Sequence, residues 1–174
     1  KNIVFIGQVK ERKGLLEAIR ALKIYNDKYS ANFKFSIIGD YQTNWKYYQQ
    51  VKSLIHRLDL EEKVEFLGII SEKEKIDFLK NADLFLMLSK NCGDYFEGFG
   101  LVYLEANKYG VPVIGPNEGG PREAIKNNFS GYKVNIFNVE EVAEKIDLIL
   151  NKNKIKRENC VIWAKAHDIN GSAK

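Results

Sequence analysis

The sequence is poor in the residues from which disulfide, metal and nucleophile sites are built. Its two cysteines, Cys92 and Cys160, are far apart and have no metal-binding spacing. We therefore expect free thiols in a reducing compartment. The two histidines, His56 and His167, are isolated, which favours ordinary surface or core roles over catalysis. No Ser/His/Asp or Cys/His grouping can be assembled, so nucleophilic catalysis of the hydrolase type is not predicted.

Long apolar runs and charge runs are also missing. The longest apolar run, Leu84–Leu88, is far too short to span a bilayer. No signal peptide precedes the first predicted strand, so we expect a domain of a longer, cytoplasmic protein. The net charge of +4 comes from scattered lysines and arginines, which does not indicate nucleic-acid binding. This charge is compatible with an anionic ligand or with a peripheral position on the cytoplasmic face of the inner membrane.

A regular alternation of strands and helices is what the sequence does contain. Hydrophobic residues make up 45% of the 174 residues and charged residues 29%, as in an ordinary globular domain with one core. Short, continuous apolar runs alternate with amphipathic patterns, which is typical of parallel strands buried on both faces. We therefore predict one α/β domain over residues 1–170, with a Rossmann-like parallel sheet of about six strands and helices on both faces.

The predicted elements follow one another without an internal repeat or a low-complexity linker. Strands are expected at Asn2–Ile6, Phe33–Ile38, Val64–Leu67, Asp83–Leu88, Val111–Ile114 and Ser130–Val134. Helices are expected at Gly14–Tyr25, Trp45–Leu58, Ser71–Asn81, Phe99–Gly110, Pro121–Lys126 and Val139–Leu150. We predict helix N-caps at Asn44 and Ser71, the second with Glu74 as its capping-box partner. The tail after Asn170 is expected to fray.

The most distinctive stretch begins at Glu97 and ends at Glu105, with Gly98, Phe99 and Gly100 running into a helical pattern. Glu97 is expected in the loop before the helix and Glu105 about two turns into it, on the order of 12 Å away along the element. The free N–H groups of the first turn lie between the two carboxylates and form an anion site. Two interpretations stay open: a cradle for an elongated ligand such as a nucleotide-sugar, or a helix-start acid and an unrelated surface acid.

Other loops that follow predicted strands should lie on the same edge of the sheet. The loop Gly7–Gly14 places three cations beside a helix N-terminus, where they could clamp a diphosphate or form a solvated basic turn. Trp45, Tyr47 and Tyr48 favour packing at a helix start, with a stacking platform as the alternative. The Gly98–Gly100 turn is not a G-x-G-x-x-G fingerprint, which argues against NAD binding.

The sequence of residues 97–125 resembles the donor-binding region of the retaining, GT-B-fold glycosyltransferases (family 4, glycosyl transferases group 1). It reads EGFGLVYLEANKYGVPVIGPNEGGPREAI. The resemblance runs from Val4 to about Ile149. It implies the donor-binding half of a GT-B fold, whose N-terminal acceptor domain is absent from this chain. It also implies no cofactor and no metal, the substrate being a UDP- or GDP-linked sugar. The lack of an Asp-x-Asp motif is consistent with this.

The resemblance also implies roles for individual residues. Glu97 would accept hydrogen bonds from the donor sugar, and Glu105 would bind the ribose hydroxyls. Lys13 matches the lysine that stabilises the leaving diphosphate. Gln8 stands where the family has an arginine, so either Arg12 substitutes or phosphate binding is weakened. Further donor contacts are implied for Gly98, Phe99, Gly100, Leu101 and Val102 at the helix start, for Gly39 after the second strand, and for Leu67 and Ile70 near the base.

The function that the resemblance implies is a retaining, metal-independent transfer of a hexosyl group from an NDP-sugar to a glycan or lipid-linked acceptor, as in polysaccharide biosynthesis. This piece alone is expected to bind the donor weakly and to have little or no transferase activity. Two alternatives stay open: a nucleotide-sugar epimerase of GT-B fold, and a non-catalytic nucleotide-binding domain. The glutamine at position 8 favours the second alternative.

Overall fold

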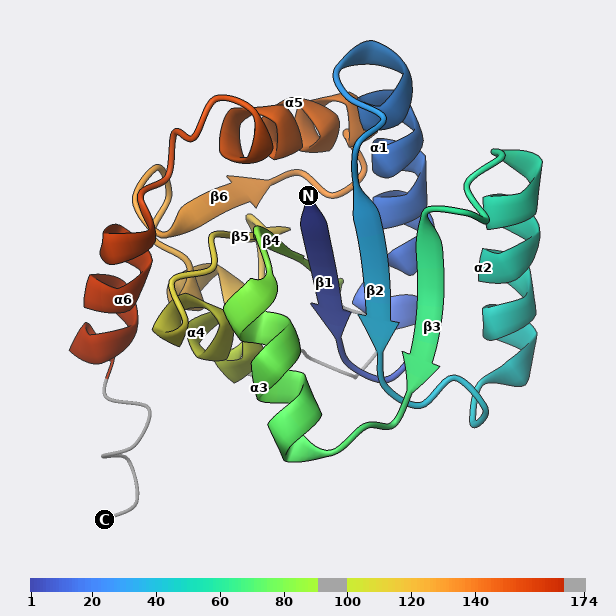
Figure 1. Ribbon diagram of the computed structural model, residues 1–174, viewed down its shortest axis with the longest axis horizontal. Helices are drawn as coiled ribbons and strands as arrows, with labels where there is room; N and C mark the ends of the chain where they lie inside the picture. The colour runs from blue at the N-terminus through green and yellow to red at the C-terminus, as the bar shows by residue number, and fades with distance from the viewer. Residues whose placement is uncertain (91–99, 168–174) are drawn as a thin grey trace.

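The computed structural model describes residues 1–90 and 100–167, and these form an α/β structure around a six-stranded sheet (Figure 1). All five strand pairings are parallel, and the strand order is β3-β2-β1-β4-β5-β6. The strands are β1 (Asn2–Ile6), β2 (Lys34–Ile38), β3 (Val64–Gly68), β4 (Leu84–Leu86), β5 (Val113–Pro116) and β6 (Gly131–Val134). The predicted fold class is therefore confirmed.

Helices cover both faces of the sheet. Figure 1 shows α1 behind the sheet and α3 in front of it, with α6 beside α4. α1 packs against both α2 and α5. The helices are α1 (Leu15–Lys28), α2 (Trp45–Arg57), α3 (Glu72–Asn81), α4 (Leu101–Lys108), α5 (Val139–Leu150) and α6 (Arg157–Ala166), with 3-10 turns η1 (Glu11–Lys13) and η2 (Gly120–Ala124). Among the described residues, no helix is long and apolar enough to cross a membrane.

The core lies between the helices and the central strands. Strands β1, β2 and β4 contribute Phe5, Phe35 and Phe85, which are fully buried. From the helices, Tyr25 and Tyr103 are buried beside them, and Tyr103 meets Phe85 edge to face at 5.5 Å between ring centroids. Continuous apolar strands thus bury side chains on both faces, as parallel strands between two helical layers must.

Helix starts show where local chemistry decides a boundary. Ser71 caps α3, and the reciprocal capping box with Glu74 is present, as predicted. Asn44 occupies the N-cap position of α2, as predicted, but its side chain makes no capping hydrogen bond. The polar groups before α2 are instead organised by Asp40, whose carboxylate accepts hydrogen bonds from the backbone N–H groups of Gln42 (2.8 Å) and Thr43 (3.2 Å).

Other elements also differ from the prediction: β4 ends at Leu86 rather than Leu88, and α1 continues to Lys28 rather than ending at Tyr25. β5 begins at Val113 rather than Val111, because the Val111 N–H bonds back to the Ala106 carbonyl at 3.1 Å and closes α4. α6 was not predicted; it packs against α4 and buries Cys160, a free thiol. Cys92 and the tail after Asn170 lie outside the described residues.

Candidate functional site

The centre of the sheet contains a topological switch point. β1 and β4 are neighbours, and the chain leaves them for helices on opposite faces, α1 and α4. Such a divergence opens a crevice beyond the carboxyl ends of the two strands, where α/β sheets bind ligands. Two close backbone contacts join the loops that follow these two strands. The Lys90 N–H donates to the Arg12 carbonyl at 2.8 Å, and a Cβ on Gly14 would lie 2.0 Å from the Leu88 carbonyl oxygen.

Three glycines end the strands on one side of this crevice. Gly7 follows β1 and donates to the Ile38 carbonyl at 2.9 Å, while Gly39 follows β2 and donates to the Gly68 carbonyl at 2.9 Å. Gly39 has φ +139, and a Cβ there would lie 2.0 Å from the Gly7 carbonyl oxygen. The structure therefore brings the predicted Gly39 turn directly against the basic loop after β1.

The basic loop places Lys13 at the end of β1. Residues 11–13 form η1, which the Lys13 N–H closes by donating to the Lys10 carbonyl at 2.9 Å. A Cβ on Gly7 would lie 3.8 Å from Lys13 Cε, so the lysine side chain passes over the first strand-end turn. Lys13 and Arg12 thus belong to a short turn immediately before the N-terminus of α1. This arrangement can present an ammonium group to an anion in the crevice.

Gln8, at the position of the expected arginine, has a structural partner. Its side chain donates to the Asp40 carboxylate, which also accepts from the Thr43 hydroxyl and the Gln42 N–H. These contacts, chiefly the hydrogen bond from the Thr43 hydroxyl, hold the pKa of Asp40 below its usual value. The neutral amide therefore joins the loop after β1 to the turn after β2.

α4 begins at Leu101, with Gly100 as its N-terminal flanking residue at φ +78. A Cβ on Gly100 would lie 3.0 Å from Pro121 Cα, so the start of α4 packs against η2. Leu101 is exposed and Val102 is partly buried against the core. The first-turn N–H groups of a helix have no partner within the helix and can meet an anion. The predicted start at Phe99, together with Glu97 and Gly98, lies outside the described residues.

Glu105 projects from α4 toward the first turn of α3. Its Oε2 lies 3.6 Å from the ammonium of Lys75, which in turn lies 2.9 Å from Glu72 Oε1. α3 follows the segment Leu67–Ile70, for which the family resemblance implies contacts near the base. Sequence reasoning missed Lys75, because a pairing across 30 positions leaves no periodic signal.

Two pockets of the described residues lie at opposite ends of the strands. One, of about 390 Å³, lies at the carboxyl ends of β4, β5 and β6 and is lined by Ser89, Lys90, Pro116, Asn117, Glu118, Pro121, Asn135, Ile136 and Phe137. Its Lys90 ammonium is held at 3.0 Å by the buried Glu17 of α1. Sequence reasoning missed this pair as well.

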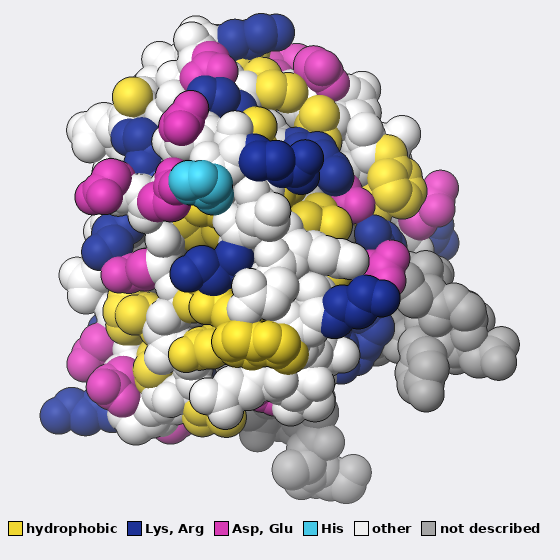
Figure 2. All heavy atoms as spheres, turned by 90° about the vertical axis from the view of Figure 1, so that its right-hand side faces the viewer, with side chains coloured by type: hydrophobic (Ala, Val, Ile, Leu, Met, Phe, Trp, Pro, Cys, Tyr) yellow, Lys and Arg dark blue, Asp and Glu magenta, His cyan; other side chains and the backbone are white. Residues whose placement is uncertain are grey.

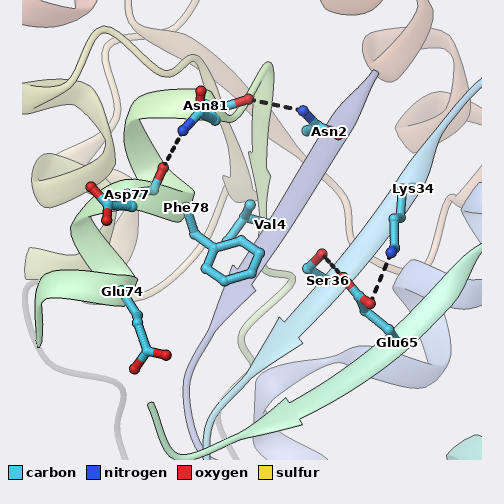
Figure 3. Close-up of a pocket in the computed structure, with 9 residues that line it drawn as sticks. All are labelled: Asn2, Val4, Lys34, Ser36, Glu65, Glu74, Asp77, Phe78 and Asn81. Atoms are coloured by element: carbon cyan, nitrogen blue, oxygen red, sulfur yellow. Dashed lines mark hydrogen bonds and ion pairs between the residues drawn. The ribbon is translucent and has the colours of Figure 1, made fainter. Parts of the chain in front are cut away.

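The other pocket, of about 430 Å³, lies over the amino-terminal halves of β1 and β2, next to α3 (Figure 3). Its polar groups are paired with one another: Glu65 accepts from Ser36 at 2.7 Å and contacts the Lys34 ammonium at 2.9 Å. Because the switch point is at the carboxyl ends of the strands, most of the lining of this pocket lies away from it. None of the predicted donor-binding residues lines it.

The distribution of charged and metal-binding side chains can be compared with the anion site expected at the switch point. Figure 2 shows positive and negative side chains interspersed over the face on the β3 and α2 side, without a continuous basic surface there. Within residues 1–90 and 100–167, no group of three or more His, Cys, Asp or Glu side chains could hold a metal ion.

Comparison with known proteins matches the sequence of this chain to one family. The family model described as glycosyl transferases group 1 matches residues 1–167. The glycosyltransferase MJ1607 of Methanocaldococcus jannaschii is 29% identical over 151 residues, which are 87% of this chain and 36% of that protein. The chain thus spans about a third of that relative's length.

Solved structures share the fold. A glycosyltransferase from Rickettsia africae superposes with a TM-score of 0.80 at 27% identity, covering 95% of this chain and 42% of that one. Anabaena Alr3699/HepE, crystallised in complex with UDP and glucose, superposes with a TM-score of 0.79 at 24% identity, covering 95% and 43%.

Proposed function

The chain belongs to the glycosyl transferases group 1 family, and from this premise we propose that it is the donor-binding domain of a retaining hexosyltransferase. The transferred sugar comes from a nucleoside diphosphate and goes to a glycan or lipid-linked acceptor. The observation that carries the proposal is the position of Glu105. It lies on α4, and its carboxylate is 3.6 Å from Lys75 in the first turn of α3, the helix that follows β3.

We propose that the nucleotide-sugar lies across the carboxyl edge of the sheet. The base contacts Leu67–Ile70, and the ribose hydroxyls donate to Glu105. The diphosphate meets the N-terminus of α4 on one side and Lys13 on the other. The sugar extends to Glu97. That Alr3699/HepE, which shares this fold, was crystallised in complex with UDP and glucose supports a nucleotide-sugar as the ligand.

The proposed catalytic roles follow from how glycosyl transfer proceeds. The bond between sugar and diphosphate breaks through an oxocarbenium-like state, so charge grows on the departing phosphate. Lys13 and the N–H groups at the start of α4 stabilise that charge, and Glu97 holds the sugar still by accepting its hydroxyl hydrogens. Lys13 therefore acts on the leaving group, and no metal ion is required for this role.

Exposed apolar side chains support a second domain facing this edge. Trp45, Ile69, Leu101 and Phe137 each follow a strand and are 55%, 82%, 55% and 69% exposed. Exposed apolar groups gathered at one edge favour contact with another surface. We propose that the acceptor domain of the same protein covers this edge.

The two glutamates provide the direct test. Glu105→Ala should weaken binding of both UDP and UDP-glucose about tenfold or more, because a hydrogen bond to a charged group is lost. Glu97→Ala should leave UDP binding unchanged and weaken only UDP-glucose. Titration calorimetry with and without EDTA measures both, and EDTA should have no effect. Equal loss of both ligands in both variants would contradict the assignment.

A non-catalytic nucleotide-binding domain would give the same binding results. The full-length protein separates the two functions, since only a transferase or its hydrolytic side reaction releases UDP from UDP-glucose. Lack of this release with any tested acceptor and donor would favour the non-catalytic alternative.

A further inference from the structure

Lys75 links the first turn of α3 to the helix that carries Glu105. Its ammonium lies 2.9 Å from Glu72 Oε1 on its own helix and 3.6 Å from Glu105 Oε2 on α4. The Lys75 side chain is 22% exposed, whereas those of Glu72 and Glu105 are 73% and 40% exposed. The most buried member of the trio is thus the cation between the two carboxylates.

This pairing leaves half of the Glu105 carboxylate available. Only Oε2 contacts the lysine, and within the described part of the chain Oε1 has no hydrogen-bonding partner. An ion pair with partners this exposed contributes little to stability. Its main physical effect is geometric, because it favours the orientation of the Glu105 side chain in which Oε2 lies beside Lys75.

The lysine is charged and itself held in place. Partial burial lowers the pKa of Lys75, but the hydrogen bond to Glu72 and the charge of Glu105 together outweigh this and raise it above the ordinary value. Glu72 anchors the ammonium at 2.9 Å on α3. The cation therefore acts from the helix that follows the predicted base-binding segment.

We propose that Lys75 is the positioning residue for ribose recognition: it fixes Glu105 through Oε2 so that Oε1 accepts the hydroxyl hydrogens of a nucleoside diphosphate. This inference rests on the proposed function, which places the ribose at Glu105. Lys75 itself does not touch the nucleotide. It couples the loop after β3, which contacts the base, to the carboxylate on α4, which contacts the sugar of the same nucleoside.

The test compares UDP with 2′,3′-dideoxy-UDP, or GDP with its dideoxy form if GDP binds more tightly, by titration calorimetry. We expect the wild-type chain to prefer the ribonucleotide by about tenfold or more, the usual effect of hydrogen bonds to a charged group. Lys75→Met should lower the affinity for the ribonucleotide and leave the dideoxy form almost unchanged, so the ratio falls toward one. Lys75→Arg should restore most of the ratio.

The matched control is Lys73→Met, since Lys73 is an exposed lysine on the same helix. It should keep the wild-type ratio. If Lys75→Met does not fold, as judged by its melting curve, Glu72→Gln replaces it. This variant removes the anchor of the ammonium and should also lower the ratio.

Each outcome separates the inference from the proposed function. If Glu105→Gln loses the ribose preference but Lys75→Met keeps it, the positioning role is wrong and the ribose contact stands. Equal weakening of both ligands in Lys75→Met would also overturn the positioning role, because it would show a general charge effect. If Glu105→Gln keeps the preference, or if the wild-type chain binds none of UDP, GDP and ADP, the proposed site is wrong and the inference with it.

Discussion

Gly39 occupies a backbone position that other residues cannot adopt without strain. Its φ is +139, and a Cβ would lie 2.0 Å from the Gly7 carbonyl oxygen. Gly39→Ala is therefore expected to lower the free energy of unfolding by about 2 kcal/mol or more. Gly7→Ala is the control, because its Cβ would meet nothing closer than 3.5 Å.

Urea unfolding of the two alanine variants measures this difference. Gly7→Ala should stay within about 0.5 kcal/mol of the wild type. Equal destabilisation by both substitutions would show that the close approach of the two turns does not limit the residue at position 39.

The environment of Asp147 indicates how the free energy of unfolding should depend on pH. Burial raises the pKa of its carboxyl, but the hydrogen bond from Asn151 (2.8 Å) and the ion pair with Lys152 (2.9 Å) outweigh this and leave the pKa below its ordinary value. Because the folded pKa is the lower one, the carboxylate stabilises the fold above the unfolded pKa of about 3.9. This contribution is lost as the pH falls through the folded pKa.

Asp147→Asn should therefore reduce stability at pH 7 and flatten the loss of stability below about pH 4. Urea unfolding between pH 7 and pH 2.5 measures both effects. Glu140→Gln on the same helix, at an exposed position, should change neither. An unchanged acid dependence in Asp147→Asn would contradict the assignment.

At the scale of elements, the two predicted helix caps give a matched pair. Ser71 makes the capping box of α3, whereas Asn44 makes no capping hydrogen bond to α2. Ser71→Ala is expected to cost about 1 kcal/mol of unfolding free energy, and Asn44→Ala much less. Thermal or urea unfolding distinguishes them, and a larger loss in Asn44→Ala would contradict the observed capping.

Elements were predictable where one physical signal dominates. The strands follow from continuous apolar runs, and the capping box of α3 follows from local residue spacing. The start of β5 and the presence of α6 were not predictable, because each depends on a contact made in three dimensions. Val111 closes α4 instead of pairing as a strand, and α6 depends on α4 for its packing.

Some features of the candidate site were likewise predictable from the sequence, and others were not. Its loops were predictable because the carboxyl ends of parallel strands share one edge. Gly39 indeed lies against the basic loop after β1. The Lys75–Glu105 and Lys90–Glu17 pairs join segments far apart in sequence, and no spacing rule identifies such partners. The role of Glu97 stays a prediction, since it lies outside the described residues.

At the scale of the whole molecule, we expect this chain to bind the nucleotide but not to catalyse sugar transfer. The chain spans 36% of the length of its relative MJ1607, and its carboxyl edge exposes apolar side chains that a second domain would cover. The chain alone should therefore bind a nucleoside diphosphate without releasing UDP from UDP-glucose. A coupled assay for UDP measures this release. Turnover by the chain alone at the rate of the full-length protein would contradict the need for an acceptor domain.

The most direct test of the account is where a nucleotide binds. A ¹⁵N-labelled sample titrated with UDP, GDP and ADP should show amide shifts at Gly7, Gly39, Gly68 and Leu101 for at least one of them. The amides of Asn2, Lys34 and Asn81, in the pocket over the amino-terminal halves of the strands, should not move. Shifts confined to that pocket, or none with any of the three nucleotides, would contradict a donor site at the switch point.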